Sequence, residues 1–286
     1  MRMAVLDGRV HVQIGPELVD IARASGGRLP SEPMAALNQW GSVRCWAGEV
    51  GAESPVELPV ASVGCPVPEP RQVFGIGLNY RLHAQESGLP IPEVPLVFTK
   101  FPSCIANPFA DLEIPTPMTD WEVELAVVIG ERVRGISRDR AWSVVAGLAV
   151  AQDYSARDVQ MTPTGSPQFS MGKSFPGFLP LGPWLVTPDE LSDPDALALW
   201  CDIDGQRVQE SNTNDLIFPV PVLIEYLSSI TTLMPGDVIL TGTPAGVGMG
   251  RSPRVFLEAG QLVESGIEGL GVMRQRTTQG GWGWRP

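Results

Sequence analysis

Apolar runs, alternating or continuous, predict many short strands along the chain. Residues 3–6 and 10–14 are strand-like and flank Asp7-Gly8, a dipeptide that favours a tight hairpin turn. Later strand-like runs lie at residues 72–78, 96–100, 122–129, 144–151, 185–187, 198–204 and 238–241. These runs do not alternate regularly with helical segments, and no segment repeats. The pattern therefore predicts a β-rich α+β fold.

Helical patterns are fewer. Residues 219–229 have a proline near their start and apolar residues on one face, which predicts the clearest helix. Two shorter helices are expected, one at residues 16–24 before a glycine pair, and one at residues 32–37 with Ser31 as its cap.

The proline-rich residues 53–70 lack a helical period and indicate a connector between two parts of the chain. We therefore expect a small N-terminal α/β domain over residues 1–65 and a main domain over residues 66–276. Residues 277–286 are expected to form an exposed tail, whose two tryptophans could pack on the surface or on a partner chain.

Composition and charge exclude several functions. The 286 residues include 20 Lys and Arg against 32 Asp and Glu, a formal net charge of −12, so no basic surface for nucleic acid or anionic lipid is expected. Two histidines cannot supply a multi-histidine zinc site. The four cysteines form no CxxC pair and fit reduced thiols, and no apolar run is long enough to cross a bilayer. We therefore expect a cytoplasmic protein with neither nucleic acid nor membrane as a partner.

Two carboxylates occur inside an apolar run. Glu122 and Glu124 lie two residues apart, and the period of a strand places both side chains on one face. Like charges there repel one another, and a divalent cation that prefers oxygen ligands (Mg²⁺, Mn²⁺ or Ca²⁺) would relieve this. Asp153 follows another apolar run and could supply a third carboxylate. Alternatively, the glutamates line an exposed strand face, and Asp153 caps a short helix.

Two further segments carry candidate catalytic groups. His83 and Glu86 would share one face of a helix, where the carboxylate could orient the imidazole as a base for activating water. Lys173 lies in a loop rich in Gly, Pro and Phe and could pair with an anion. Alternatively, His83 and Glu86 are an ordinary surface pair, and Lys173 is a solvated loop lysine. The glycine-rich runs at 75–77 and 241–248 lack the remaining residues of a dinucleotide or phosphate loop.

Taken in order along the chain, these segments resemble the fumarylacetoacetate hydrolase family. The resemblance rests on GxGxNYxxHxxE, FTKFPS, DWExELAVVIG, QDxSARDxQ, GKSF…PLGPWLVT and TGTPAGVG, which together span about residues 74–271. It implies a mixed β-roll catalytic domain after a small N-terminal domain, and a homodimer. It also implies a divalent metal held by Glu122, Glu124 and Asp153. Pro176 and Gln261 depart from the pattern, because many relatives have Asp at these positions.

The resemblance also implies roles for the other residues. His83 and Glu86 correspond to the dyad of the acylpyruvase-like branch, and Lys173 corresponds to the family's lysine after the SARD segment. Contacts with an oxo-acid substrate are expected from Arg157, Gln160, Thr243 and Tyr80.

The function that the resemblance implies is metal-dependent hydrolysis of a carbon–carbon bond in an acylpyruvate or β-diketo acid through a metal-stabilised enolate. The same site could instead serve an oxaloacetate-type decarboxylase, or an isomerase of keto-enol or unsaturated keto acids. A metal-binding dimer without turnover is the third alternative. The departures at Pro176 and Gln261 leave the acyl group of the substrate open.

Overall fold

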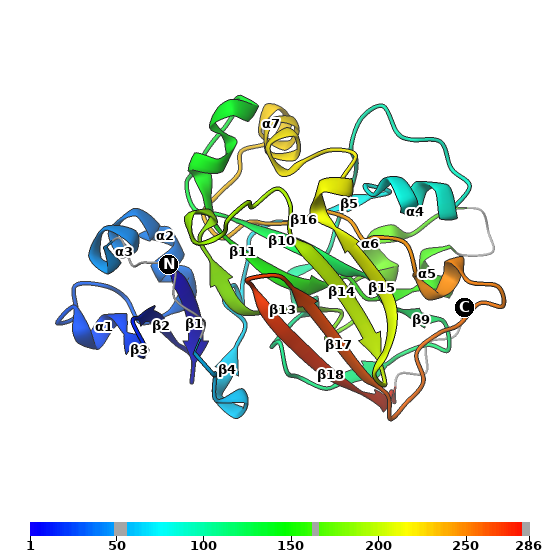
Figure 1. The fold of residues 1–286 in the computed structure, drawn as a ribbon, viewed down its shortest axis with the longest axis horizontal. Helices are drawn as coiled ribbons and strands as arrows, with labels where there is room; N and C mark the ends of the chain where they lie inside the picture. The colour runs from blue at the N-terminus through cyan, green and yellow to red at the C-terminus, as the bar shows by residue number, and fades with distance from the viewer. Residues whose placement is uncertain (49–55, 162–165, 282–286) are drawn as a thin grey trace.

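The computed structural model describes residues 1–48, 56–161 and 166–281, and two large sheets form its frame (Figure 1). The larger has eleven strands, nine of them in the order β3 (Glu17–Asp20), β2 (Arg9–Ile14), β1 (Arg2–Leu6), β13 (Leu179–Val186), β11 (Val145–Gln152), β10 (Val123–Ile129), β16 (Val238–Leu240), β5 (Val73–Gly77) and β6 (Leu96–Thr99). The other two are β4 (Val63–Gly64), which pairs with β1, and β7 (Ile105–Ala106), which pairs with β13.

The second sheet and the helices complete the fold. The second sheet has the order β15 (Gln206–Asn212), β14 (Ala198–Ile203), β17 (Leu262–Ile267), β18 (Gly271–Gln279) and β8 (Leu112–Ile114), and a separate pair joins β12 (Ser155–Ala156) to β9 (Thr119–Asp120). The α-helices are α1 (Ile21–Ala24), α2 (Pro33–Asn38), α3 (Trp40–Ala47), α4 (Arg81–Glu86), α5 (Arg157–Gln160), α6 (Phe169–Gly172) and α7 (Val220–Ile230). In the described ranges, no helix is long and apolar enough to cross a membrane. The predicted strand-rich α+β class is confirmed.

The centre of the larger sheet is fully buried. Every residue of β10, β11 and β13 is buried, and strands β14, β17 and β18 of the second sheet contact this central group. A strand that is covered on both faces requires a continuous apolar sequence, which these three strands have. Glu124 in β10 is the charged exception, so the tertiary structure must compensate its burial.

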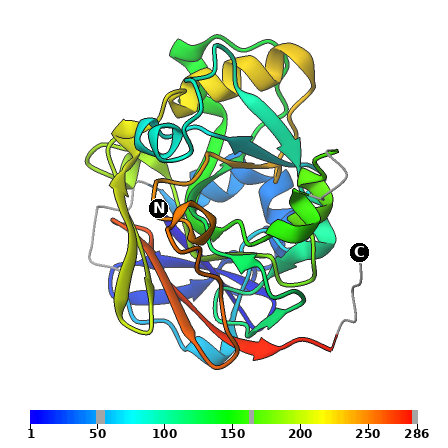
Figure 2. The same cartoon turned by 90° about the vertical axis from the view of Figure 1, so that its right-hand side faces the viewer.

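The predicted helix at residues 219–229 is present as α7. Its apolar face is buried, and the helix lies beside the 3₁₀ helix Arg138–Val144 (Figure 2). An ion pair of 2.7 Å between Arg138 and Glu225 joins the two on their exposed side. The packing of an apolar helical face thus agrees with the sequence pattern.

The N-terminal hairpin is confirmed, with β1 paired to β2 around Asp7-Gly8. The single helix predicted at residues 16–24 is wrong in its first half, because residues 17–20 form β3 beside β2. Asp20 ends this strand and accepts two backbone N–H groups of the next turn, so that α1 begins only there. Glu32, rather than Ser31, caps α2 in the same way, and the sequence pattern did not predict α3.

The first strands of the chain join the sheet of the main domain. β1 pairs with β13, so the boundary predicted at residue 65 crosses one continuous sheet, and the division into two domains stays a prediction. At the other end, β18 continues to Gln279 and pairs with β8. Residues 277–279 therefore belong to the sheet rather than to the predicted exposed tail. Trp282 and Trp284 lie outside the described residues.

Candidate functional site

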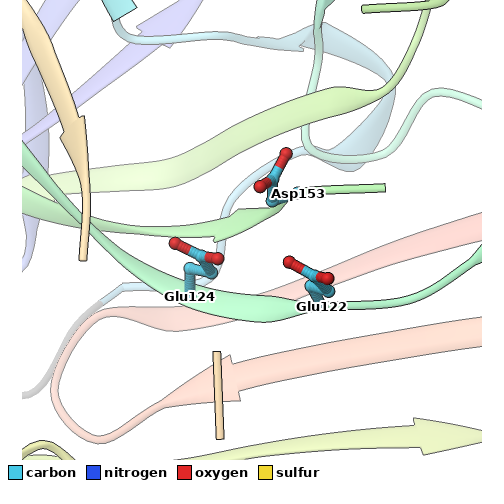
Figure 3. A group of neighbouring side chains, drawn as sticks. All are labelled: Glu122, Glu124 and Asp153. Carbon is cyan, nitrogen blue, oxygen red and sulfur yellow. The ribbon is translucent and has the colours of Figure 1, made fainter. Parts of the chain in front are cut away.

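Three carboxylates converge where β10 begins and β11 ends. Glu122 directly precedes β10, Glu124 lies within it, and Asp153 directly follows β11. The antiparallel register pairs Val123 with Gln152, and the Asp153 N–H donates to the Glu122 carbonyl at 2.9 Å. Ligand oxygens of all three side chains lie within 4.8 Å of one another, and all three residues are buried (Figure 3). The structure thus brings together the trio predicted from the sequence.

The three carboxylates have unequal electrostatic surroundings. Burial alone would raise the pKa of Glu122, but Lys173 and Arg157, each 2.7 Å from its oxygens, outweigh burial and lower this pKa to about 2. Burial raises the pKa of Glu124 well above its usual value, and Asp153 and Glu122 raise it further. Among the described residues, Glu124 has no ion-pair partner and accepts only the N–H of Gly242, at 2.7 Å. A cation with oxygen ligands would stabilise the ionised form of Glu124, so the trio fits a hard divalent metal.

Both lysines of the chain bind Asp153. Lys173 donates to Asp153 Oδ2 at 2.6 Å, as well as to Glu122. Lys100, which directly follows β6, donates to Asp153 Oδ1 at 2.6 Å and to the carbonyl of Phe178 at 3.0 Å. The role of Lys100 was not predicted. The available signal was its rarity, because residues 100 and 173 are the only lysines in the sequence.

The predicted dyad is formed on α4. His83 Nδ1 lies 3.1 Å from Glu86 Oε2, and the N–H of Gly246 donates to both Glu86 oxygens at 3.0 and 3.2 Å. Burial opposes ionisation of Glu86, but these hydrogen bonds from His83 and Gly246 prevail and lower its pKa. With Nδ1 donating to this carboxylate, Nε2 is the ring nitrogen that remains to accept a proton.

The glycine-rich segment 241–250 binds carboxylates of the chain itself. The backbone N–H of Gly242 donates to Glu124, that of Gly246 to Glu86, and that of Gly248 to Asp120 at 2.7 Å. A Cβ at Gly248 would lie 1.9 Å from a backbone oxygen, and Gly246 has a φ of +107° that disfavours any side chain. Backbone N–H groups that cradle a phosphate in other proteins here position three acids.

Arg157 is anchored by an aspartate that the sequence pattern did not single out. Asp120 is fully buried and accepts Arg157 Nε and Nη2, both at 2.8 Å, and also the N–H of Gly248. Arg157 Nη1 donates to Gln160 Oε1 at 2.8 Å. The guanidinium group is therefore held in one orientation, between Asp120, Glu122 and Gln160.

A second buried amide positions Thr243. Gln209 Nε2 donates to Thr243 Oγ1 at 2.8 Å, while Gln209 Oε1 accepts the N–H of Val123 at 3.0 Å. The Thr243 hydroxyl in turn donates to the carbonyl of Val123 at 3.0 Å. Gln209 was also not predicted, since its strand β15 is distant in sequence from both partners.

A cavity of about 190 Å³ adjoins these groups. Besides Ser87, its polar lining consists of predicted site residues, which form its polar wall, namely His83, Glu122, Glu124, Arg157, Gln160, Lys173 and Thr243. Asp153 and Glu86 lie directly behind this wall, bound to Lys173 and His83. Tyr80 does not line the cavity: its side chain is fully buried, its hydroxyl has no partner among the described residues, and burial raises its pKa.

Comparison with known proteins agrees with this geometry. The family model of the fumarylacetoacetate (FAA) hydrolase C-terminal domain matches residues 72–278. The chain belongs to the fumarylacetoacetate hydrolase family. The resemblance inferred from the sequence motifs is thereby confirmed.

Three solved structures show how closely the chain follows the fold of this family. A Mycobacterium smegmatis protein provisionally named HpcE is 49% identical, with a TM-score of 0.91 over 98% of this chain and 99% of that one. A probable 2-hydroxyhepta-2,4-diene-1,7-dioate isomerase from Mycobacterium abscessus is 31% identical, with a TM-score of 0.78 over the whole of both chains. A maleylpyruvate hydrolase from Sphingobium sp. SYK-6, solved with manganese(II) and pyruvate, is 29% identical, with a TM-score of 0.78 over 98% of this chain and 100% of that one.

The family places the site among enzymes. Its members include hydrolases and isomerases that act on small organic acids, as the names of these neighbours state. The predicted fold of a fumarylacetoacetate hydrolase-type domain is confirmed by the same neighbours, and the carboxylate trio could hold a divalent metal.

Proposed function

We propose that the protein is a divalent-metal-dependent hydrolase that cleaves a carbon–carbon bond in an acylpyruvate or a related β-diketo acid. The observation that carries this proposal is that His83, backed by Glu86, faces the same cavity as Lys173 and the glutamates of the trio. One cavity is thus lined by a base that can deprotonate water, a cation that can stabilise a developing anion and ligands that can bind a metal. The manganese and pyruvate bound to the maleylpyruvate hydrolase support the same chemistry.

Glu122, Glu124 and Asp153 would hold the divalent cation, for which we propose Mg²⁺, with Mn²⁺ or Ca²⁺ as alternatives. Once bound, the cation would supply Lewis-acid polarisation and a template for the 2-oxo acid end of the substrate. Arg157, with Gln160 and Thr243 beside it in the polar wall, would bind the carboxylate and carbonyl oxygens of that end.

His83 would act as general base. Nε2 takes a proton from a water molecule while the water oxygen attacks the carbonyl carbon of the acyl group, and Glu86 stabilises the imidazolium that forms. The bond between this carbon and the adjacent methylene then breaks, and its electron pair passes into the enolate of pyruvate. Lys173 lies in the wall where this negative charge develops. Protonation of the enolate carbon by His83 gives pyruvate and the second acid, and restores the base.

An isomerase is the alternative that a specific observation favours, because the Mycobacterium abscessus neighbour is named for such a reaction. Isomerisation moves a proton on the enolate and needs no attacking water, and decarboxylation of an oxo acid would release CO₂. Pyruvate with a second carboxylic acid indicates hydrolysis, pyruvate with CO₂ indicates decarboxylation, and a product of unchanged mass indicates isomerisation.

The test of this function is turnover of acetylpyruvate by the purified protein. With Mg²⁺ present, we expect equal amounts of pyruvate and acetate, and no turnover after the metal is removed with EDTA. Glu86→Gln should lower kcat about 100-fold, because the imidazolium loses its anionic partner. The exposed Glu93→Gln is the matched control and should keep wild-type kcat. Wild-type kcat in Glu86→Gln, or CO₂ as a product, would contradict the proposed hydrolysis.

We also propose a homodimer and a location in the cytoplasm. The side chains of Ile91, Val94 and Phe101 are apolar and about half exposed, and contact with a second copy of the chain would bury side chains of this kind.

A further inference from the structure

The cavity has two chemically different walls. The rest of the lining is mainly apolar and includes Ile76, Leu78, Leu89, Leu96, Phe98 and Phe169. The Phe98 and Phe169 rings pack against one another with centroids 5.9 Å apart. A molecule whose oxo-acid end meets the polar wall therefore places its remaining arm against hydrocarbon.

The apolar wall is built by the pairing of β5 with β6. Gly75 is opposite Phe98 and Gly77 is opposite Leu96 in this register. A Cβ at Gly75 would lie 2.3 Å from the Phe98 ring, and a Cβ at Gly77 would lie 2.8 Å from Leu96. The two glycines thus let these large side chains lie over β5 and form the wall.

The cations of the lining are already paired at the polar wall. Lys173 is bound by Glu122 and Asp153, and Arg157 is bound by Asp120 and Glu122. Throughout the described part of the lining, no other Lys or Arg occurs. Arg251, whose guanidinium lies near the site, donates instead to the carbonyls of Val208 and Gly246. A second carboxylate on the substrate arm would therefore lie against hydrocarbon with no further cationic side chain to pair with.

We propose that the acyl arm of the substrate is uncharged and apolar, so that the enzyme prefers 2,4-dioxo monoacids to 2,4-dioxo diacids. This specificity rests on the proposed hydrolase function and deepens it. It also separates this chain from the two neighbours named for the diacids 2-hydroxyhepta-2,4-diene-1,7-dioate and maleylpyruvate. The volume of about 190 Å³ lies below the roughly 300 Å³ at which sites for drug-sized ligands begin, which indicates a short arm.

A matched pair of substrates tests the proposal. 2,4-Dioxoheptanoate and 2,4-dioxoheptanedioate have the same carbon chain and end in a methyl group and a carboxylate, respectively. With the Mg²⁺-loaded protein, we expect kcat/KM to be about 100-fold higher for the monoacid. Equal or higher kcat/KM for the diacid would overturn the proposed specificity while the hydrolase function stands. If neither these compounds nor acetylpyruvate is cleaved, the hydrolase function fails. Thermal-shift titrations with both compounds then measure the preference for an uncharged arm. Binding of the diacid that is as tight as that of the monoacid, or tighter, would overturn this preference.

A charge placed on the apolar wall tests where the arm lies. Leu89 lines the cavity and Leu82 does not, yet both side chains are 55% exposed, so a lysine at either position can keep its ammonium group in water. Leu89→Lys should raise kcat/KM for the diacid about tenfold, and Leu82→Lys, the matched control, should leave it unchanged. The oligomeric state of both variants is measured in parallel. An equal change in both variants, or no change in either, would show that the arm does not meet this wall.

Discussion

At the residue scale, both lysines of the chain are buried beside the carboxylate trio, whereas most of the described arginines other than Arg157 are exposed. The sequence has 20 basic residues, of which only Lys100 and Lys173 are lysines, and both ammonium groups contact Asp153. An ammonium group is a compact charge with three donors, so the single nitrogen of Lys173 can bind both Glu122 and Asp153. Lys173 was predicted as a site residue from its motif. The spacing along the chain could not reveal that Lys100 contacts Asp153.

Lys100→Met should destabilise the metal-free protein by about 3 kcal/mol. Lys100 and Asp153 are both fully buried, and removal of the ammonium group leaves Asp153 Oδ1 without its ionic partner. Because a divalent metal would then compensate Asp153, Mn²⁺ should raise the Tm of the variant more than that of the wild type. Calorimetric unfolding with and without Mn²⁺ measures both effects. An unchanged Tm in the absence of metal would show that Lys100 does not stabilise this carboxylate.

At the element scale, strand register and one loop position the chemical groups. The register of β10 against β11 places Asp153 beside Glu122, an arrangement that the family resemblance implied and that the apolar pattern alone left open. The loop after β16 supplies three backbone N–H groups to three acidic side chains. No sequence pattern indicated these bonds, because a glycine in the sequence indicates backbone freedom but not which group its N–H binds.

Gly248→Ala should disrupt this loop and lower activity on acetylpyruvate at least tenfold. The added Cβ would meet a backbone oxygen at 1.9 Å and Asp120 Oδ1 at 2.7 Å, so the segment that anchors Arg157 through Asp120 must shift. Gly41→Ala is the matched control: it lies in α3 with open space around its Cβ, so stability should stay equal or rise by about 0.4–1 kcal/mol. The measurements are kcat/KM and Tm, and equal behaviour of the two variants would contradict the role of the loop.

Some strands were unpredictable from hydrophobicity because their buried side chains are polar. In β18, Gln275 and Thr277 point inward along with Met273. Gln275 accepts the hydroxyl of Tyr154, and the Thr277 hydroxyl donates to the Glu258 carbonyl, so hydrogen bonds satisfy these groups once the chain is folded. A strand of this kind resembles an exposed segment in sequence, which explains why residues 277–279 were assigned to a tail.

At the scale of the whole molecule, the N-terminal part extends the sheet that carries the site. β1 pairs with β13, and β13 pairs with β11, the strand that leads to Asp153 (Figure 1). The sequence predicted a small separate domain because its hairpin and helices are followed by a proline-rich segment. Sheet continuity between β1 and β13 could not be predicted, because residues 2–3 and 185–186 are far apart along the chain.

Removal of residues 1–65 should therefore destabilise the remaining chain. The deletion uncovers the edge of β13, a buried apolar strand, and an exposed edge of this kind favours aggregation. We expect a Tm at least about 5 °C lower than that of the full chain and a larger aggregated fraction, measured by calorimetry and light scattering. A truncated chain with the Tm and solubility of the full protein would instead show that the two parts are independent domains.

Motifs along the chain were enough to identify the family and, through it, the carboxylate trio, while the local periods of two and 3.6 residues were enough to predict the strand-rich class. Only the tertiary structure revealed Lys100, Asp120 and Gln209 as supports of the site, together with the apolar wall formed over Gly75 and Gly77. Each of these depends on side chains brought together from distant parts of the chain. The charges and hydrogen bonds that compensate a buried group become apparent only when the packing around that group is known.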